Sequence, residues 1–429
     1  MGSQQRPAHI LLILAGGTIC MKSSENGYIP SRGLLSVCLA GHEAFDDGSR
    51  PEALEIVDEK GIRRPGDASF VLPPVFTSTS DPAVHYTAFE FDQLIDSSSA
   101  DSHYWNILAQ CVLRNYDKFD GFVILHGTDT LAFAASALSF LLNPLSKPVI
   151  MTGSQVSIFD EPSDAWDNIL GSLTIAGQRQ IDEVCVFFHG NLFRGNRCLK
   201  IHASEYAAFA SPNLSPLVSF DGAIGKGRGP AVGQPIHDPS MVTNALEPLV
   251  EMNSAQVAVL RIYPGIQAST LEAIVNTPGL RGLVIETFGA GNMPEGPKGE
   301  LLQILRDAIE RDVTVVNISQ CLNGTVSPIY APAKALERLG VVYGHDMTAE
   351  AAYTKLLYLI ACPDLSTADI RRLMSSDIRG ELTKAKPAID RTTDEPQRSR
   401  RRRESLVVTG LEWRTYYPRV VGRSVSRER

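Results

Sequence analysis

Short continuous apolar runs recur in the first half of the chain and predict strands that are buried on both faces. The runs are Ile10–Ala15, Phe122–Leu125, Pro148–Met151 and Val184–Phe188. Helical patterns lie between or beside them, at Trp105–Leu113, Thr130–Leu142 and Asp164–Ala176. Strands that alternate with helices imply βαβ units and a parallel sheet.

The same alternation resumes in the second half of the chain. The predicted strands are Ala255–Ile262, Gly282–Thr287 and Val313–Ile318. The predicted helices are Ser269–Asn276, Glu300–Arg311, Thr348–Ile360 and Thr367–Ser375. We therefore expect an α/β fold class with two α/β domains and mainly parallel sheets, a larger N-terminal domain over residues 1–222 and a smaller C-terminal domain over residues 251–385.

Three segments interrupt this pattern. Residues 39–82 are rich in proline and glycine and are expected to form an irregular insertion. Glycines and prolines crowd Asp221–Pro239, so residues 223–250 are expected to link the domains. Residues 386–429 hold twelve Lys or Arg against six Asp or Glu, and we expect a basic, disordered tail. The rest of the chain is acidic, because the net charge of the whole is −8.

Composition narrows the function classes. With 44% hydrophobic and 21% charged residues the chain is typical of globular proteins, and no apolar run approaches the roughly 20 residues that span a bilayer. The seven cysteines are scattered and form no C-x-x-C pair, which suits a reducing, cytoplasmic compartment better than disulfides or zinc. No H-E-x-x-H pair occurs among the nine histidines, so we expect no catalytic metal.

Two threonines stand at the carboxyl ends of predicted strands. Thr18 follows Gly16-Gly17, and Thr128-Asp129 follows His126-Gly127. Ligands of open α/β sheets bind at this edge, and glycine lets the backbone turn sharply there. The two hydroxyls could therefore converge on one small molecule, as in a threonine-based hydrolase.

Each accompanying polar residue has a functional and a structural interpretation. Tyr28, expected on a mobile loop, could relay the proton of Thr18 or be a surface aromatic residue. Asp129 could pair with a cationic amine of a substrate, or could cap the following helix. Lys200 could serve as a base if desolvated, or remain a solvated surface charge. The cluster Asp96-Ser97-Ser98 could bind a carboxylate or form a helix cap.

Several motifs occur together and in order, and the combination strongly resembles the bacterial-type L-asparaginase family, in particular its cytoplasmic type I branch. The motifs are Gly16-Gly17-Thr18-Ile19, Gly27-Tyr28-Ile29-Pro30, Asp96-Ser97-Ser98, His126-Gly127-Thr128-Asp129-Thr130, Thr152-Gly153-Ser154-Gln155, Arg194-Gly195-Asn196-Arg197, Ala210-Ser211-Pro212-Asn213 and Asn317-Ile318-Ser319-Gln320-Cys321. The resemblance extends from about Ile10 to Leu382, outside residues 39–82.

This resemblance implies a function and a set of site residues. Family members hydrolyse L-asparagine to L-aspartate and ammonia without a cofactor, as homodimers or homotetramers built from close dimers. At matching positions, Thr18 would be the nucleophile with Tyr28 as its partner, and Thr128 the second hydroxyl with Lys200 as its base. Asp129 would hold the α-amino group of the substrate. The α-carboxylate would be held by Asp96, Ser97 and Ser98.

Two of the departures from the family pattern concern an effector site. Glu286 and Leu199 stand where members with an effector site for asparagine are expected to carry an arginine and a hydroxyl residue. A carboxylate cannot replace a cationic clamp, which argues against cooperative activation by the substrate. A glutaminase-asparaginase of broader specificity and an inactive amino-acid-binding homologue remain alternatives. The arginine-rich tail could contact phosphates, but no nucleic-acid-binding fold accompanies it, so nucleic acid is not expected as a partner.

Overall fold

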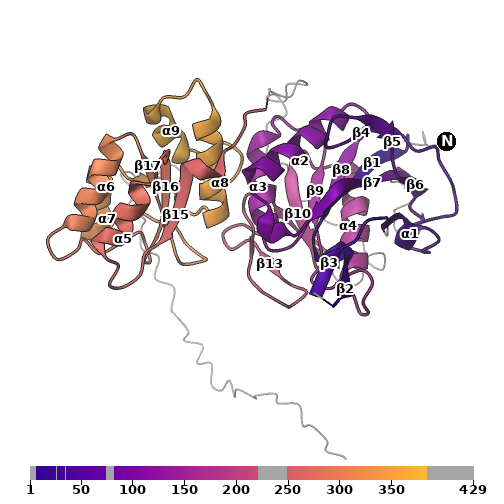
Figure 1. Cartoon of the computed structure of the whole chain (residues 1–429), viewed down its shortest axis with the longest axis horizontal. Coiled ribbons are helices and arrows are strands. Elements are labelled where there is room, and N and C mark those ends of the chain that lie inside the picture. The colour runs from indigo at the N-terminus through magenta and orange to yellow at the C-terminus, as the bar shows by residue number, and fades with distance from the viewer. Residues whose placement is uncertain (1–5, 26, 34, 74–81, 221–248, 384–429) are drawn as a thin grey trace, which may run out of the picture. The chain divides into compact units, whose positions relative to one another are not determined.

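The computed structural model describes residues 6–25, 27–33, 35–73, 82–220 and 249–383. The expected linker lies almost entirely outside the described residues, and the expected basic tail lies wholly outside them. Two α/β domains with mainly parallel sheets are present, the larger at the N-terminus and the smaller at the C-terminus, which confirms the predicted fold class (Figure 1).

The N-terminal domain is built on an eight-stranded sheet with the order β14-β11-β10-β9-β8-β1-β7-β6. Its strands are β1 (Ala8–Gly16), β6 (Ala68–Val71), β7 (Val84–Ile95), β8 (Gly121–Leu125), β9 (Val149–Thr152), β10 (Val184–Phe188), β11 (Asn191–Arg194) and β14 (Val218–Ser219). The five central strands, from β10 to β7, are parallel, and antiparallel strands flank them on both sides. The four apolar runs of the first half of the sequence therefore form strands.

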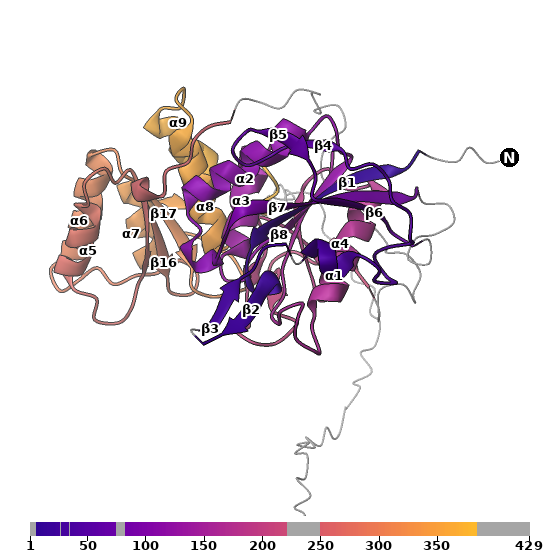
Figure 2. The same cartoon turned by 45° about the vertical axis from the view of Figure 1, so that its right-hand side comes forward.

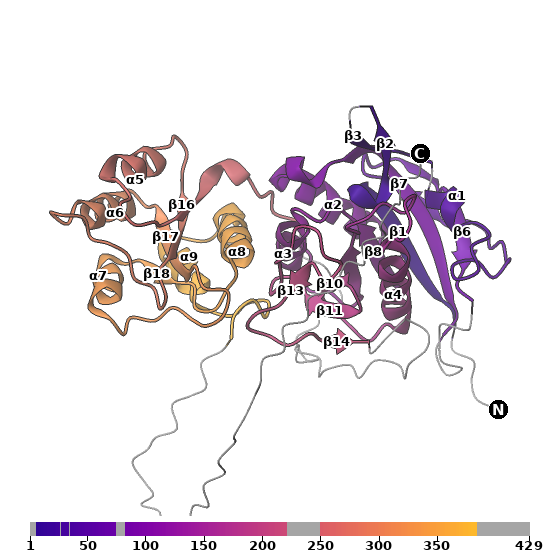
Figure 3. The same cartoon turned by 90° about the horizontal axis from the view of Figure 1, so that it is seen from below.

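Helices cover both faces of this sheet because successive side chains of β1 point to opposite sides. Leu11 and Ile13 pack in one core with α2 (Ser102–Asn115) and α3 (Leu131–Leu141). Ile10, Leu12 and Leu14 pack in a second core with α4 (Ala165–Gln178) on the other face. Figures 1 and 3 show α2 and α3 on one side of the strands and α4 on the other. Because the five central strands are parallel, their carboxyl ends lie at one edge of the sheet.

Residues 39–82 hold more regular structure than their prolines suggested. They contain the end of α1 (Leu35–Leu39), the hairpin formed by β4 (Glu55–Val57) and β5 (Arg63–Pro65), and strand β6. Strand β6 pairs antiparallel with β7 and completes one edge of the main sheet. The segment is thus partly built into the N-terminal domain.

The C-terminal domain has a four-stranded parallel sheet with the order β15-β16-β17-β18. Its strands are β15 (Val257–Arg261), β16 (Gly282–Thr287), β17 (Thr314–Ser319) and β18 (Val342–Tyr343). Its helices are α5 (Ala268–Val275), α6 (Glu300–Glu310), α7 (Ala331–Leu339), α8 (Ala349–Ala361) and α9 (Thr367–Met374). The predicted elements lie within three residues of the observed ones, whereas α7 and β18 were not predicted.

Candidate active site

Two glycines bring the two threonine-bearing turns into contact. A Cβ atom added to Gly17 would lie 2.3 Å from the Cα of Gly127, closer than real Cβ atoms approach a backbone. Strands β1 and β8 are parallel neighbours, with Leu14 opposite Leu125, so the turns that follow them leave the sheet side by side. Thr18 and Thr128 each follow one of these glycines and therefore project from adjoining points of the backbone.

The turn that carries Thr18 is held by hydrogen bonds on both sides. Thr18 begins a short 3-10 helix, η1 (Thr18–Cys20), and is itself half-buried. The amide of Gly17 donates to the carbonyl of Ile95 at the end of β7 (3.0 Å). The amide of Ile158 donates to the carbonyl of Ile19 (3.1 Å). These two hydrogen bonds hold the backbone that carries the Thr18 hydroxyl.

Thr128 and Asp129 share one cation. Lys200, on the short strand β12 (Leu199–Lys200), donates from Nζ to Thr128 Oγ1 and to Asp129 Oδ1, both at 2.8 Å. Thr128 is buried, and only 18% of the Lys200 side chain is exposed. Lys200 is therefore directed into the site by an ion pair. Its low exposure and its two bonds argue against the interpretation of Lys200 as a solvated surface charge.

The capping role considered for Asp129 is wrong. Helix α3 begins at Leu131, and Thr130 occupies the N-cap position without a capping hydrogen bond from its side chain. Thr130 Oγ1 instead donates to the carbonyl of Ser97 (2.7 Å). The Asp129 carboxylate accepts a charge-assisted hydrogen bond from Lys200 instead of capping the helix. Such a bond is stronger than one between neutral groups.

The Asp96-Ser97-Ser98 cluster contributes a buried hydroxyl beside Gly127. Ser97 begins the short helix η3 (Ser97–Ser99), and the Asp96 carboxylate caps it by accepting from the Ser98 amide (2.8 Å). Ser97 is buried, and a Cβ atom on Gly127 would lie 2.4 Å from Ser97 Oγ. Asp96 and Ser98 are exposed. The structure therefore brings Ser97 to the threonine turns and uses Asp96 as a local cap.

Tyr28 lies on a strand, which corrects the prediction of a mobile loop. Strands β2 (Met21–Ser24) and β3 (Gly27–Pro30) form a hairpin, drawn as the indigo pair of arrows in Figure 2, and β3 contacts η1. The Tyr28 side chain is half-exposed, and its hydroxyl donates to Asp160 Oδ2 (2.8 Å). This hydrogen bond, together with the negative charge of Asp160, raises the pKa of Tyr28. The structure places Tyr28 on an element next to Thr18, with its hydroxyl bonded to Asp160.

One residue near Thr128 was quoted in a motif without a role. Gln155 follows β9, and its Oε1 accepts from Thr128 Oγ1 (3.3 Å). The backbone amide of Gln155 donates to both carboxylate oxygens of Asp164 (3.0 and 3.1 Å). Burial raises the pKa of Asp164, and the hydrogen bonds that it accepts oppose this effect. The position of Gln155 at the carboxyl end of a buried strand was the signal that could have identified it.

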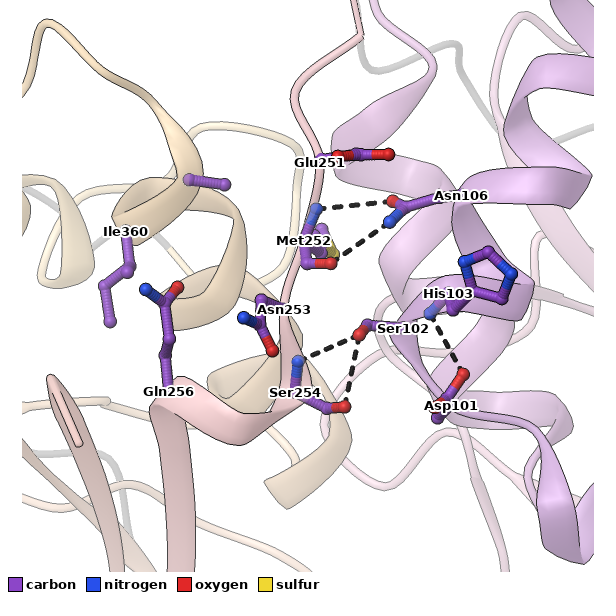
Figure 4. A pocket seen from close by; sticks show the side chains of 11 residues that line it. Asp101, Ser102, His103, Asn106, Glu251, Met252, Asn253, Ser254, Gln256 and Ile360 are labelled. Carbon is purple, nitrogen blue, oxygen red and sulfur yellow. Dashed lines mark hydrogen bonds between the residues drawn. The ribbon is translucent and has the colours of Figure 1, made fainter. Parts of the chain in front are cut away.

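A polar pocket lies elsewhere, where α2 meets residues 251–256 (Figure 4). There Asn106 bonds both the amide (3.3 Å) and the carbonyl (3.1 Å) of Met252. Ser102 Oγ accepts from the Ser254 amide (2.8 Å). These polar groups hold the incoming backbone of the C-terminal domain. None of the threonine-site residues lines the pocket, so we assign it to the junction of the domains.

The part of the chain that the structure describes shows neither a metal site nor a membrane span. In that part of the chain, no group of three His, Cys, Asp or Glu side chains could hold a metal ion. Among the helices described, none combines the length and the apolar character needed to cross a membrane.

Comparisons with known proteins agree with the geometry. Residues 9–228 match the family model described as "Asparaginase, N-terminal", and residues 256–374 match "Glutaminase/Asparaginase C-terminal domain". L-asparaginase 1 of Escherichia coli (strain K12) is 38% identical over 87% of this chain and 98% of its own length. The crystal structure of L-asparaginase I from Vibrio cholerae superposes with a TM-score of 0.70 at 36% identity, covering 88% of this chain and 99% of that one.

A mammalian protein with a different name is also similar. The "60 kDa lysophospholipase" of Mus musculus is 41% identical over 89% of this chain. The chain spans 63% of the length of that relative.

Proposed function

The chain belongs to the bacterial-type asparaginase family, in its type I branch, and on that premise we propose that it hydrolyses L-asparagine to L-aspartate and ammonia. The observation that carries the proposal is the backbone contact between Gly17 and Gly127. It supports a single cleft in which the Thr18 and Thr128 hydroxyls reach the same small molecule. Lys200 supplies a cation and Asp129 an anion at the same place.

In the proposed first step, the Thr18 hydroxyl attacks the side-chain amide carbon of asparagine. The C–O bond forms, the C–N bond breaks, and the proton of Thr18 leaves with the departing ammonia. Tyr28 is the proposed relay for that proton, because β3 contacts the turn that carries Thr18. Its hydroxyl would exchange Asp160 for Thr18 as the substrate binds.

In the proposed second step, water attacks the aspartyl ester on Thr18, which releases aspartate and restores the hydroxyl. Thr128 and Lys200 are the proposed proton carriers on this side of the substrate, and such a group typically contributes about 10²–10⁴ in rate. Asp129 would pair with the α-amino group, since 61% of its side chain is exposed. Ser97 would hold the α-carboxylate, with Asp96 and Ser98 beside it.

Two alternative substrates follow from the same chemistry. Glutamine is one methylene longer than asparagine, a difference worth only about 1–3 kcal/mol of discrimination. The name of the mouse relative indicates an ester substrate, and a threonine nucleophile can cleave an ester by the same two steps. We place asparagine first because the charged groups at the site suit a free amino acid.

The test is a comparison of substrates with the purified full chain. We expect kcat/KM for ammonia release from asparagine to exceed that from glutamine, and no release of fatty acid from lysophosphatidylcholine. A higher value with glutamine would replace the proposed substrate. Binding of asparagine without ammonia release would instead identify an inactive amino-acid-binding homologue.

Assembly and compartment are part of the same proposal. We propose a homodimer or homotetramer, the assembly that membership of the family implies. We propose a cytoplasmic compartment because the seven cysteines are free and four of them are buried. Sedimentation velocity of the purified protein distinguishes these assemblies from a monomer.

A further inference from the structure

The connection between β9 and α4 reaches both threonine turns. The amide of Ile158 bonds the carbonyl of Ile19, next to Thr18, and Ser157 Oγ donates to the carbonyl of Met21 (2.5 Å). At its other end, Gln155 bonds Thr128. One segment thus supports both hydroxyl-bearing turns, and Gln155 is its side-chain contact with Thr128.

The backbone that carries Gln155 is itself held in place. The backbone amides of Gln155 and Val156 donate to the buried carboxylate of Asp164. Asn168, on the first turns of α4, donates to the carbonyl of Gly153 (3.0 Å) and to Asp164 Oδ2 (3.2 Å). Residues 153–156 are therefore anchored to α4, and the Gln155 side chain extends from a fixed base.

Both ends of the Gln155 amide have a defined partner. Nε2 donates to the carbonyl of Glu205 (3.2 Å), which can only accept, so Oε1 must be the end that faces Thr128. The Lys200 ammonium has no acceptor, so it donates to Thr128 Oγ1. The Thr128 hydroxyl consequently donates a hydrogen bond to Gln155 Oε1 and accepts one from Lys200 Nζ.

We propose that Gln155 is a positioning residue for Thr128, an inference that rests on the proposed function. A threonine side chain has three staggered χ1 positions, and the bonds to Gln155 and Lys200 together select one of them. Gln155 therefore keeps the Thr128 hydroxyl within reach of Lys200.

The test compares Gln155→Met with Gln155→Glu. Methionine matches the length of glutamine but offers no strong acceptor, so we expect kcat to fall about tenfold while KM for asparagine changes less than about threefold. Glutamate keeps an acceptor for Thr128, and we expect it to retain kcat within about threefold of wild type. Both variants lose the Nε2 group that donates to the carbonyl of Glu205. Equal impairment of the two would therefore mean that Gln155 acts only as a structural link, and would overturn the proposal.

Tyr206→Phe is the matched control. The Tyr206 hydroxyl donates to the carbonyl of Pro162 (2.9 Å), so this variant removes a hydrogen bond to the same connection without contacting Thr128. We expect it to leave kcat unchanged. A wild-type kcat in Gln155→Met would overturn the role of Gln155 and leave the proposed function intact. A wild-type protein that hydrolyses no amide would overturn the function and, with it, this role.

Discussion

Lys200 Nζ lies 2.8 Å from Thr128 Oγ1 and at the same distance from a carboxylate oxygen of Asp129. Replacing this lysine by methionine removes the only charged partner shown for Thr128 among the described residues. We expect Lys200→Met to lower kcat by about 10²–10⁴, the usual contribution of a placed acid or base. The measurement is ammonia release at saturating asparagine.

Lys118→Met is a suitable comparison for that variant. Lys118 forms a surface ion pair with Glu55 (3.1 Å), an interaction worth about 0–1 kcal/mol at most. We expect it to leave kcat unchanged. Equal loss in both lysine variants would mean that Lys200 matters only for folding.

The contact between Gly17 and Gly127 predicts that neither turn tolerates a side chain. Gly17 has φ 92° and ψ 175°, a conformation essentially restricted to glycine, and its Cβ would overlap the Gly127 backbone. We expect Gly17→Ala to destabilise the fold by roughly 3 kcal/mol or more and to lower kcat/KM at least about 100-fold. Thermal unfolding and ammonia release measure the two effects separately.

Gly265→Ala separates the strain of a positive φ from the steric contact. Gly265 has φ 83°, but no atom lies within 4 Å of its added Cβ. We expect Gly265→Ala to lower the free energy of unfolding by about 1–2 kcal/mol and to leave kcat/KM unchanged. Full activity in Gly17→Ala would contradict a shared cleft built on the two glycine turns.

An ion pair between a buried arginine and a partly buried carboxylate predicts how the stability of the protein depends on acid. Arg197 Nη2, from the N-terminal domain, lies 2.9 Å from Asp346 Oδ2 of the C-terminal domain; Arg197 is buried and Asp346 is partly buried. Burial alone would raise the pKa of Asp346, but hydrogen bonds from Arg197 and Thr383 outweigh it and hold that pKa below its usual value. A depressed carboxyl pKa stabilises the folded state above the unfolded value of about 3.9, and that stabilisation is lost as the pH falls through the folded pKa.

We therefore expect Asp346→Asn to lower the free energy of unfolding by roughly 3 kcal/mol at pH 7, because it leaves Arg197 buried without its counter-ion. Below about pH 4 the difference in unfolding free energy between this variant and wild type should shrink. Urea unfolding at pH 7 and pH 3 measures both values. Asp92→Asn, which breaks an exposed pair with Lys60, should change little at either pH. A constant difference between Asp346→Asn and wild type across this range would contradict the interpretation.

The residue at the expected effector position predicts simple kinetics. Glu286 Oε2 lies 3.6 Å from Arg261 Nη1. Glu286 thus places a carboxylate where effector-binding relatives are expected to carry arginine. We expect hyperbolic dependence of rate on asparagine, with a Hill coefficient of about 1. A sigmoidal curve would show that activation by the substrate survives without that arginine.

The sequence predicts the positions of Thr18 and Thr128 well because each follows glycine at the end of a fully apolar strand. Local pattern alone does not predict the contact of Lys200, which lies 72 residues from Thr128 and on a strand of two residues; only the family resemblance paired the two. Strand β7 escaped prediction because Glu90 and Asp92 interrupt its apolar pattern, although β7 pairs with β1 beside the site. Asp129 was open to interpretation as a cap because the competing charge of Lys200 is invisible in local sequence.

Tyr28 shows the same limit for a flexible-looking segment. Its glycine and proline neighbours indicated a loop, whereas pairing with Met21–Ser24 makes the segment a strand. The hydrogen bond to Asp160 joins residues 132 positions apart, which no local pattern encodes. Long-range contacts therefore decide what the short motifs leave open.

The most direct measurement is the rate of ammonia release from asparagine by Thr18→Ala and Thr18→Ser beside wild type, each checked for cooperative unfolding. We predict that Thr18→Ala loses nearly all activity and that Thr18→Ser, which retains a hydroxyl, keeps a measurable part of it. A folded Thr18→Ala protein that releases ammonia at the wild-type rate would show that the attacking group is elsewhere.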